Sequence, residues 1–217
     1  MDYRLDRKLA VEFIGMFLFV FTVGMATESA NKSGAILAPV AIGSILMVLV
    51  FAGGHVSGGH YNPAVSTAVW LRGRIRANEY VAYMATQFVA AALAGLLVNA
   101  IGGKQTAGPT ASTGKMLVVE FLFTFGLAYV VLNVATAKGT EGNSFYGLAI
   151  GFLVLVGAIS VGWVSGAAFN PAIALGASVL GAFNWSHIWI YLLADFLGAA
   201  VAAGAFLYIQ GELAKAE

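Results

Sequence analysis

Residues 53–70 read GGHVSGGHYNPAVSTAVW and residues 165–172 read SGAAFNPA, so the chain holds two Asn-Pro-Ala motifs, each after a Ser-Gly pair. The first motif starts at Asn62 and the second at Asn170, an offset of 108 residues. The same offset aligns further residues of the two halves without gaps: Glu12 with Glu120, Phe17 with Phe125, Ser57 with Ser165, and Tyr83 with Tyr191. A constant register over most of each half predicts an internal structural repeat.

The composition indicates a membrane protein. Of the 217 residues, 60% are hydrophobic and 10% are charged, and the mean hydropathy is +0.86. A helix needs about 20 apolar residues to cross the hydrocarbon core of a bilayer. Six apolar runs approach that length, three in each half: 9–26, 35–52, 80–101, 116–135, 146–164 and 187–209. This composition excludes a soluble protein, and a formal net charge of +1 without a basic face excludes nucleic acid as a partner.

Two shorter apolar segments, 62–71 and 170–180, are too short to cross a membrane and begin at the Asn-Pro-Ala motifs. Asn is a favoured N-cap, and Pro63 and Pro171 then occupy the first helical position, where proline is tolerated. The segments are predicted to be re-entrant half-helices. Irregular backbone is expected before each of them, at 55–61 and at 165–169, and at membrane depth it must be buried in protein or line a wet cavity.

The positive charges predict the orientation. If six helices alternate in direction, one side of the membrane receives more of them: Arg4, Arg7, Lys8, Arg72, Arg74, Arg76, Lys138 and Lys215. The other side receives only Lys32, Lys104 and Lys115. The positive-inside rule then places both termini in the cytoplasm, for a multi-pass protein of the plasma (inner) membrane. Three spans per repeat make the second copy upside down, so the half-helices enter from opposite faces and their amino termini meet near the midplane.

This meeting point has a chemical consequence. Each helix amino terminus carries about half a positive charge, so two of them together repel a cation. The side-chain amides of Asn62 and Asn170 offer N–H donors, and the irregular stretches offer carbonyl oxygens. A neutral hydrogen-bonding molecule can exchange its solvent partners for these groups at little cost. The pair therefore predicts a selective pore, although either Asn alone is also read as a plain helix cap.

The two motif segments, the paired glutamates and the inverted three-plus-three layout resemble the aquaporin family, also called the major intrinsic proteins. The resemblance covers nearly the whole chain. It implies an all-α fold of six tilted transmembrane helices and two re-entrant half-helices. The whole chain, 1–217, would then form one channel domain, with inverted repeats at 1–103 and 114–217. It also implies a homotetramer in membrane lipid with one pore per subunit, which passes water or small uncharged solutes without being an enzyme.

The resemblance also assigns roles to site residues. The pore motifs are Asn62, Pro63, Ala64, Asn170, Pro171 and Ala172. Glu12, Glu120 and His55 are expected to brace the irregular loops, and backbone carbonyls are expected to face the pore at Gly58, Gly59, His60, Gly166 and Ala168. For the two glutamates a proton relay is the alternative, because ionisable groups inside spans are functional candidates by default. No cofactor is implied, and three His without Cys make a metal site at His55 and His60 a poor prediction.

The outer constriction departs from the family. Most members carry an arginine directly after the second Asn-Pro-Ala, whereas this chain has Ile173 there and no arginine after Arg76. Counting by family spacing places the other constriction residues at Ile42, Ala158 and Ala167, so the predicted filter is small and apolar. The chain also has Ala174 where glycerol-specialised relatives usually have aspartate. Trp163 is a second candidate for setting the constriction.

The expected function is passive conduction of water and other small uncharged solutes through this relaxed filter. One alternative is a facilitator specialised for urea, ammonia, glycerol or neutral metalloid acids, with minor water flux. An ion-coupled secondary transporter also uses inverted repeats and broken helices, but it usually needs acidic or polar residues at the midplane. Asp195, inside the last span, is expected to be a buried hydrogen-bond partner rather than part of a subunit interface.

Overall fold

Six long helices form the body of the molecule. The computed structural model describes residues 3–33, 37–102, 105 and 108–211. The long helices are α1 (Leu5–Ser33), α2 (Ala38–Ser57), α4 (Ala77–Gly102), α5 (Thr113–Thr136), α6 (Tyr146–Ser165) and α8 (Ile188–Ile209). All six are long and apolar enough to cross a membrane, which confirms the six predicted spans. The described part of the chain contains no strand.

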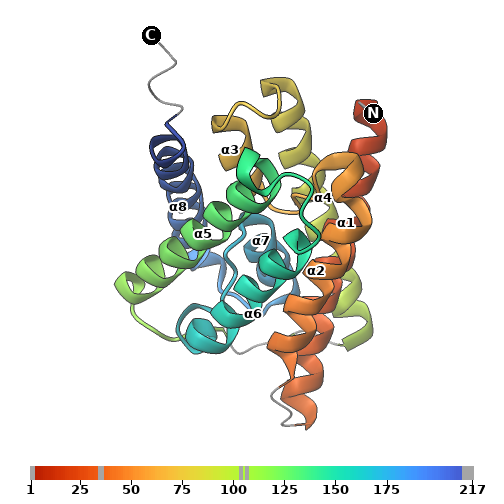
Figure 1. The fold of residues 1–217 in the computed structure, drawn as a ribbon. Coiled ribbons are helices and arrows are strands. Elements are labelled where there is room, and N and C mark those ends of the chain that lie inside the picture. The colour runs from red at the N-terminus through yellow and green to blue at the C-terminus, as the bar shows by residue number, and fades with distance from the viewer. Residues whose placement is uncertain (1–2, 34–36, 103–104, 106–107, 212–217) are drawn as a thin grey trace.

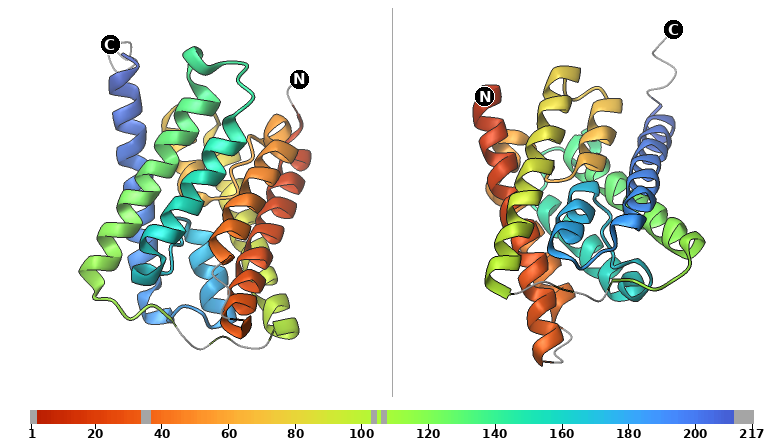
Figure 2. Two further views of the ribbon diagram at one scale, coloured as in Figure 1. Left: turned by 60° about the horizontal axis from the view of Figure 1, so that its bottom comes forward. Right: turned by 180° about the vertical axis from the view of Figure 1, so that it is seen from behind.

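The two half-helices, α3 (Pro63–Leu71) and α7 (Pro171–Leu180), lie inside the ring of long helices (Figure 1). Figure 2 shows α3 toward the end of the molecule where α1 begins and α8 ends, and α7 toward the opposite end. The amino-terminal ends of α3 and α7 therefore approach each other in the middle of the bundle. Two short 3₁₀ turns, Lys138–Thr140 and Trp185–His187, precede α6 and α8.

Several helix ends differ from the predicted spans: α1 continues to Ser33, beyond the predicted end at residue 26, and the ends of α2 and α6 bear on the site. Helix α2 continues to Ser57, so His55 and Ser57 are helical and the first irregular stretch begins only at Gly58. Helix α6 likewise continues through Ser165. Both helices stop where a glycine adopts a left-handed conformation, with φ of 91° at Gly58 and 85° at Gly166. The predicted start of the second span, Ala35, lies outside the described residues.

The two halves of the chain meet where α2 crosses α6. A Cβ atom on Gly43 would lie 2.7 Å from the carbonyl oxygen of Gly151, and one on Gly151 would lie 2.5 Å from that of Gly43. Only glycine leaves room for backbones this close. The 108-residue offset relates these two glycines to each other.

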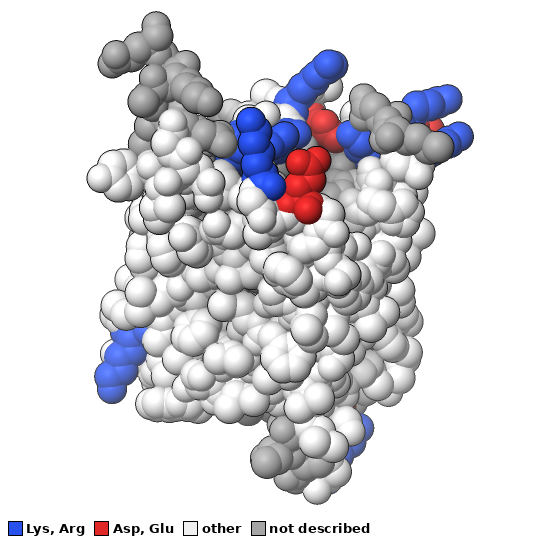
Figure 3. All heavy atoms as spheres, in the orientation of Figure 1, with Lys and Arg blue, Asp and Glu red and all other residues white. Residues whose placement is uncertain are grey.

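Charged side chains gather at one end of the molecule, and a broad uncharged band separates them from a few at the other end (Figure 3). Helix α1 begins and α8 ends at the more charged end (Figure 1). An uncharged band of this kind matches the hydrocarbon layer of a membrane. The protein is therefore an integral multi-pass membrane protein.

Candidate pore and its paired asparagines

The backbone between α2 and α3, and between α6 and α7, is held in unusual conformations. Tyr61 has φ of 44°, Ala167 of 54° and Phe169 of 48°, and among the described residues these are the non-glycine residues with positive φ. Residues other than glycine rarely adopt a positive φ, because this backbone conformation is strained for them. The strain persists only where surrounding contacts impose the conformation. A glutamate on α1 contributes to holding the first loop, and a glutamate on α5 contributes to holding the second.

Glu12 on α1 lies behind the first loop and is fully buried. Its Oε1 accepts hydrogen bonds from the backbone N–H of His60 at 2.9 Å and from Ser57 Oγ at 2.7 Å. Its Oε2 accepts from the backbone N–H of Tyr61 at 2.8 Å and from Gln87 Nε2 at 2.8 Å. Four donors therefore converge on one carboxylate, which satisfies the charge in the low-dielectric interior.

Glu120 on α5 has the corresponding place behind the second loop and is also fully buried. Its Oε1 accepts from the backbone N–H of Ala168 at 3.1 Å, and its Oε2 from that of Phe169 at 2.7 Å. Both glutamates thus bond the two residues that come just before the asparagine of their loop. These contacts have the geometry of braces, which is the role that the family resemblance gives them.

Asn62 and Asn170 each cap their own half-helix and bond the opposite loop. Oδ1 of Asn62 accepts from the backbone N–H of Ala64 at 2.8 Å, and Oδ1 of Asn170 accepts from that of Ala172 at 2.9 Å. Nδ2 of Asn62 donates to the carbonyl of Phe169 at 2.9 Å, while Nδ2 of Asn170 donates to that of Tyr61 at 2.8 Å. A carboxamide NH₂ has two hydrogens, so each Asn keeps one donor for another acceptor.

Three cavities follow one another through the bundle. A wide cavity of about 750 Å³, which we name the inner vestibule, lies at the end where α1 begins, and a cavity of about 350 Å³, which we name the outer cavity, lies at the other end. Between them is a void of only about 10 Å³, lined by Asn62 and Asn170. The small void shares His60 and Val131 with the inner vestibule, and Phe19, Val154 and Ala168 with the outer cavity. The smallest space therefore lies beside the paired asparagines and holds about one water molecule.

The loop carbonyls give this path a row of acceptors. Within the described chain, no hydrogen bond ends on the carbonyl oxygens of the residues predicted to face the pore: Gly58, Gly59, His60, Gly166 and Ala168. Each of these residues lines at least one of the three cavities. Carbonyl oxygens without a protein donor can accept hydrogen bonds from a solute in transit.

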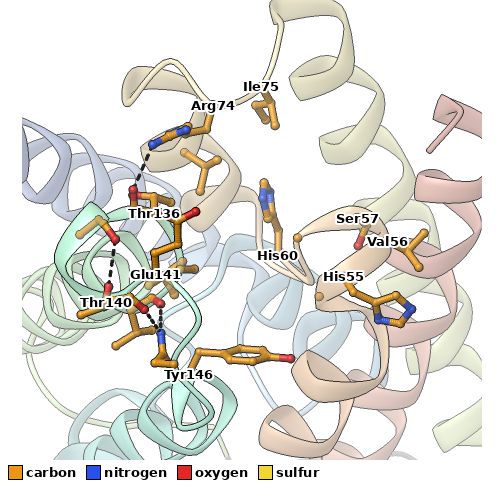
Figure 4. Close-up of a pocket in the computed structure, with 18 of the residues that line it drawn as sticks. His55, Val56, Ser57, His60, Arg74, Ile75, Thr136, Thr140, Glu141 and Tyr146 are labelled. Carbon is orange, nitrogen blue, oxygen red and sulfur yellow. Dashed lines mark hydrogen bonds between the residues drawn. The ribbon is translucent and has the colours of Figure 1, made fainter. Parts of the chain in front are cut away.

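The inner vestibule combines polar groups from several elements (Figure 4). His60 projects toward it, and its Nδ1 lies 3.0 Å from Ser66 Oγ. Arg74 Nη2 donates to the carbonyl of Thr136 at 3.1 Å at the rim of this vestibule.

His55 does not occupy the bracing position that was predicted for it. It lies on the last helical turn of α2, is exposed, and packs edge-on against Tyr3 with 6.4 Å between ring centroids. The helix carries its side chain away from the loop because α2 continues to Ser57. The loop is instead held by Glu12 and by Ser57, whose Oγ accepts from the backbone N–H of Gly59 at 3.0 Å.

The four residues of the predicted filter line one space, the outer cavity: Ile42 from α2, Ala158 from α6, Ala167 from the second loop and Ile173 from α7. Ile173 is 4% exposed and forms part of the cavity wall near the start of α7. Trp163 lines the same cavity but is 76% exposed, and its Nε1 donates to the carbonyl of Ser160 at 3.2 Å. The wall that Ile42, Ala158, Ala167 and Ile173 form is apolar.

Several residues that sequence reasoning did not assign also support the site. Tyr83 and Tyr191 donate from their hydroxyls to the carbonyls of Ser57 at 2.8 Å and Ser165 at 2.6 Å, so they fix the last turns of α2 and α6. Their identical spacing from the two motifs is a signal that the sequence did carry. Gln105, which lines the outer cavity, donates through Nε2 to the carbonyl of Gly24 at 3.0 Å, and nothing in the sequence marked it.

Asp195 on α8 is fully buried, as expected for an interior hydrogen-bond partner. Its Oδ1 accepts from Thr124 Oγ1 on α5 at 2.9 Å. Its Oδ2 has no hydrogen-bond donor in the part of the chain that the structure describes. As for metals, the residues that the structure describes contain no group of three or more His, Cys, Asp or Glu with the geometry of an ion site.

Comparison with known proteins gives a consistent answer. The family described as Major intrinsic protein matches residues 2–208. Aquaporin NIP1-4 of Oryza sativa subsp. japonica is 34% identical over 97% of this chain and 79% of its own length. Glycerol uptake facilitator protein-like 6 of Lactiplantibacillus plantarum is 36% identical over 91% of this chain and 95% of its own length. The X-ray structure of the aquaglyceroporin from Plasmodium falciparum has the same fold, with a TM-score of 0.82 over 99% of this chain and 100% of that chain at 19% identity.

Proposed function

This chain belongs to the major intrinsic protein family, so it is a passive channel and not an enzyme, and we propose that it conducts water together with other small uncharged solutes. The observation that carries the proposal is the pair of asparagines. Asn62 and Asn170 each bond the opposite loop and keep one amide hydrogen free beside the smallest void of the path. A water molecule or a hydroxyl group can accept from that hydrogen and donate to the loop carbonyls.

Ions are disfavoured at the same point. The amino termini of α3 and α7 meet beside the asparagines, so about half a positive charge from each helix faces the path. A cation loses its hydrating water there without gaining a negatively charged partner, which is unfavourable. A neutral solute only exchanges one hydrogen-bond partner for another. An ion-coupled transporter would need acidic ligands at this midpoint, and the two motifs supply amides and carbonyls instead.

The outer cavity supports the wider solute range. The filter wall of Ile42, Ala158, Ala167 and Ile173 carries neither a charge nor a side-chain donor. The volume of the outer cavity is about 350 Å³. A wall of this kind neither holds a single file of water by fixed donors nor excludes a bulkier uncharged molecule. A facilitator specialised for such solutes, with minor water flux, is the second candidate, and the relative named as a glycerol uptake facilitator favours it.

The charge distribution supports the proposed orientation. Described cations at the end where α1 begins and α8 ends are Arg4, Arg7, Lys8, Arg72, Arg74, Arg76 and Lys138. At the other end, Lys32 lies in the last turn of α1 and Lys115 in the first turn of α5. Lys104 and Lys215 lie outside the described residues. By the positive-inside rule, both termini face the cytoplasm. The plasma (inner) membrane, the homotetramer and the two inverted repeats, 1–103 and 114–217, belong to the same proposal and rest on the family resemblance.

A tryptophan placed in the outer cavity is expected to block the path. Ala158 lines this cavity from α6, and Ala158→Trp should lower both water and glycerol flux by roughly tenfold, a barrier increase of about 1.4 kcal/mol, because the indole occupies the open space. The measurement is light scattering of proteoliposomes after an osmotic step.

The matched control is Ile159→Trp. Ile159 is the next residue of α6 and is 61% exposed on the outside of the bundle, so the same bulky side chain should leave both fluxes at the wild-type level. Equal fluxes in Ala158→Trp and wild type would show that the solute path does not pass through the outer cavity.

A further inference from the structure

The two halves of the chain brace their loops with different chemistry. The 108-residue offset pairs Gln87 on α4 with Asp195 on α8. Gln87 Nε2 donates to Glu12 Oε2 at 2.8 Å and to Ser66 Oγ at 3.1 Å. The first glutamate therefore accepts a hydrogen bond from a side-chain amide. In the second half, the same position holds a carboxyl group, and an ionised carboxyl has no hydrogen to donate.

The surroundings of Asp195 make the difference consequential. Among the described residues, Oδ1 is bonded by Thr124, which lies one helical turn after Glu120 on α5, and Oδ2 is buried without a donor. The repeat places Asp195 against Glu120 as it places Gln87 against Glu12, so the two carboxyl groups face each other. If both were ionised, two like charges would be buried side by side with no cation between them. A single proton removes one charge and turns the contact into a hydrogen bond.

We propose that Glu120 and Asp195 share one proton, and that this proton does for the second pore loop what the Gln87 amide does for the first. The proton lies between the Glu120 carboxylate and Oδ2 of Asp195. Asp195 is then a positioning residue. It steadies Glu120, and Glu120 bonds the backbone N–H groups of Ala168 and Phe169 just before Asn170.

The other groups around Asp195 do not replace this proton. From α5 it meets Glu120 and Thr124, and the backbone N–H of Asn170, just before α7, lies near it without making a hydrogen bond to Oδ2. On α8 itself, Tyr191 faces both acids but donates its hydroxyl to the carbonyl of Ser165. Helices α3 and α7, which also pack against α8, contain no charged or titratable residue.

The shared proton links the outer loop to pH. Because the folded chain binds a proton that the same acids release in the unfolded chain at neutral pH, stability falls as the pH rises. Loss of the proton places a second charge beside Glu120 and weakens its hold on the loop. The effect on flux rests on the proposed channel function, whereas the proton itself does not.

Infrared difference spectroscopy of the purified full-length protein tests the proton directly. At pH 7 the wild type should show one protonated carboxylic acid band, shifted in heavy water, that is absent from Asp195→Asn and from Glu120→Gln. In both variants a neutral amide supplies the donor permanently. The matched variant Gln87→Glu builds the same acid pair beside Glu12 and should add a band. Wild-type and Asp195→Asn spectra without a difference in this region, or a Gln87→Glu spectrum without the added band, would overturn the proposal.

The pH dependence of the thermal midpoint gives a second test. It would not differ between wild type and Asp195→Asn if Asp195 had only a structural role. The thermal midpoint of the wild type in detergent should fall between pH 7 and pH 9, and that of Asp195→Asn should fall less. The difference between the two pH dependences should correspond to the release of one proton. Equal slopes in the two proteins would contradict the shared proton. If the infrared band is present but no flux is measured in proteoliposomes, the shared proton stands and the proposed conduction fails, so the two results can be separated.

Discussion

Glu12→Ala is expected to collapse the first pore loop and abolish conduction. The carboxylate accepts the backbone N–H groups of His60 and Tyr61, and neither has another acceptor among the described residues. Each buried N–H left without an acceptor costs about 1–3 kcal/mol, so the two together cost about 2–6 kcal/mol. That is a large part of the total stability of a typical domain. Tyr61, with its positive φ, would then relax, and its carbonyl would leave Asn170.

The measurement is the thermal midpoint in detergent together with water flux in proteoliposomes. The control is Glu28→Ala on the same helix, which removes an ion pair of 3.0 Å with Lys32, whose side chain is 66% exposed. Such pairs contribute about 0–1 kcal/mol, so this variant should stay close to the wild type. If Glu12→Ala kept the wild-type midpoint and flux, the loop would not depend on the glutamate behind it.

Ile173→Arg is expected to lower the ratio of glycerol or urea flux to water flux. Ile173 lines the outer cavity together with the second loop. The carbonyls of Gly166 and Ala168 in this loop have no hydrogen-bond donor among the described residues and can accept the guanidinium N–H groups. The long side chain narrows the cavity and adds fixed donors that suit water. Glycerol and urea flux should fall by roughly tenfold or more, about 1.4 kcal/mol per tenfold, while water flux changes much less.

The conservative variant Ile173→Met separates charge from volume. It keeps an apolar side chain of similar size at the cavity wall, so the ratio of glycerol to water flux should stay at the wild-type value. Circular dichroism and gel filtration of Ile173→Arg come first, because an unpaired cation at membrane depth destabilises the fold. A folded Ile173→Arg protein with an unchanged flux ratio would move the selectivity away from residue 173, with Trp163 as the next residue to test.

The spans and half-helices could be predicted because their signals are local. Hydropathy marks each span in the sequence, and an Asn-Pro pair marks the start of a helix whose first N–H groups need a cap. The exact end of α2 was less predictable. The apolar pattern fades near residue 52, but the helix continues to Ser57 because nothing breaks it before Gly58 turns left-handed. That continuation carries His55 away from the loop.

Contacts between distant segments could not be predicted from either segment alone. The bonds from Asn62 to Phe169 and from Asn170 to Tyr61 join residues more than 100 positions apart, and they depend on where both loops lie. The same holds for Asp195, whose burial was expected but whose carboxyl neighbour, Glu120, comes from a different helix. Cavity sizes depend on side-chain packing between several helices, so the volumes of the outer cavity and of the void beside the asparagines could not be predicted either.

The most direct test of the proposed function is a pair of flux measurements on wild-type proteoliposomes, with empty liposomes as the reference. One uses an impermeant osmolyte and reports water flux, and the other uses glycerol or urea and reports solute entry. We expect both fluxes to exceed the reference, with solute entry linear in concentration and independent of sodium or proton gradients. Water flux with solute entry at the level of empty liposomes would contradict the relaxed outer filter, and saturable, ion-dependent entry would contradict a passive channel.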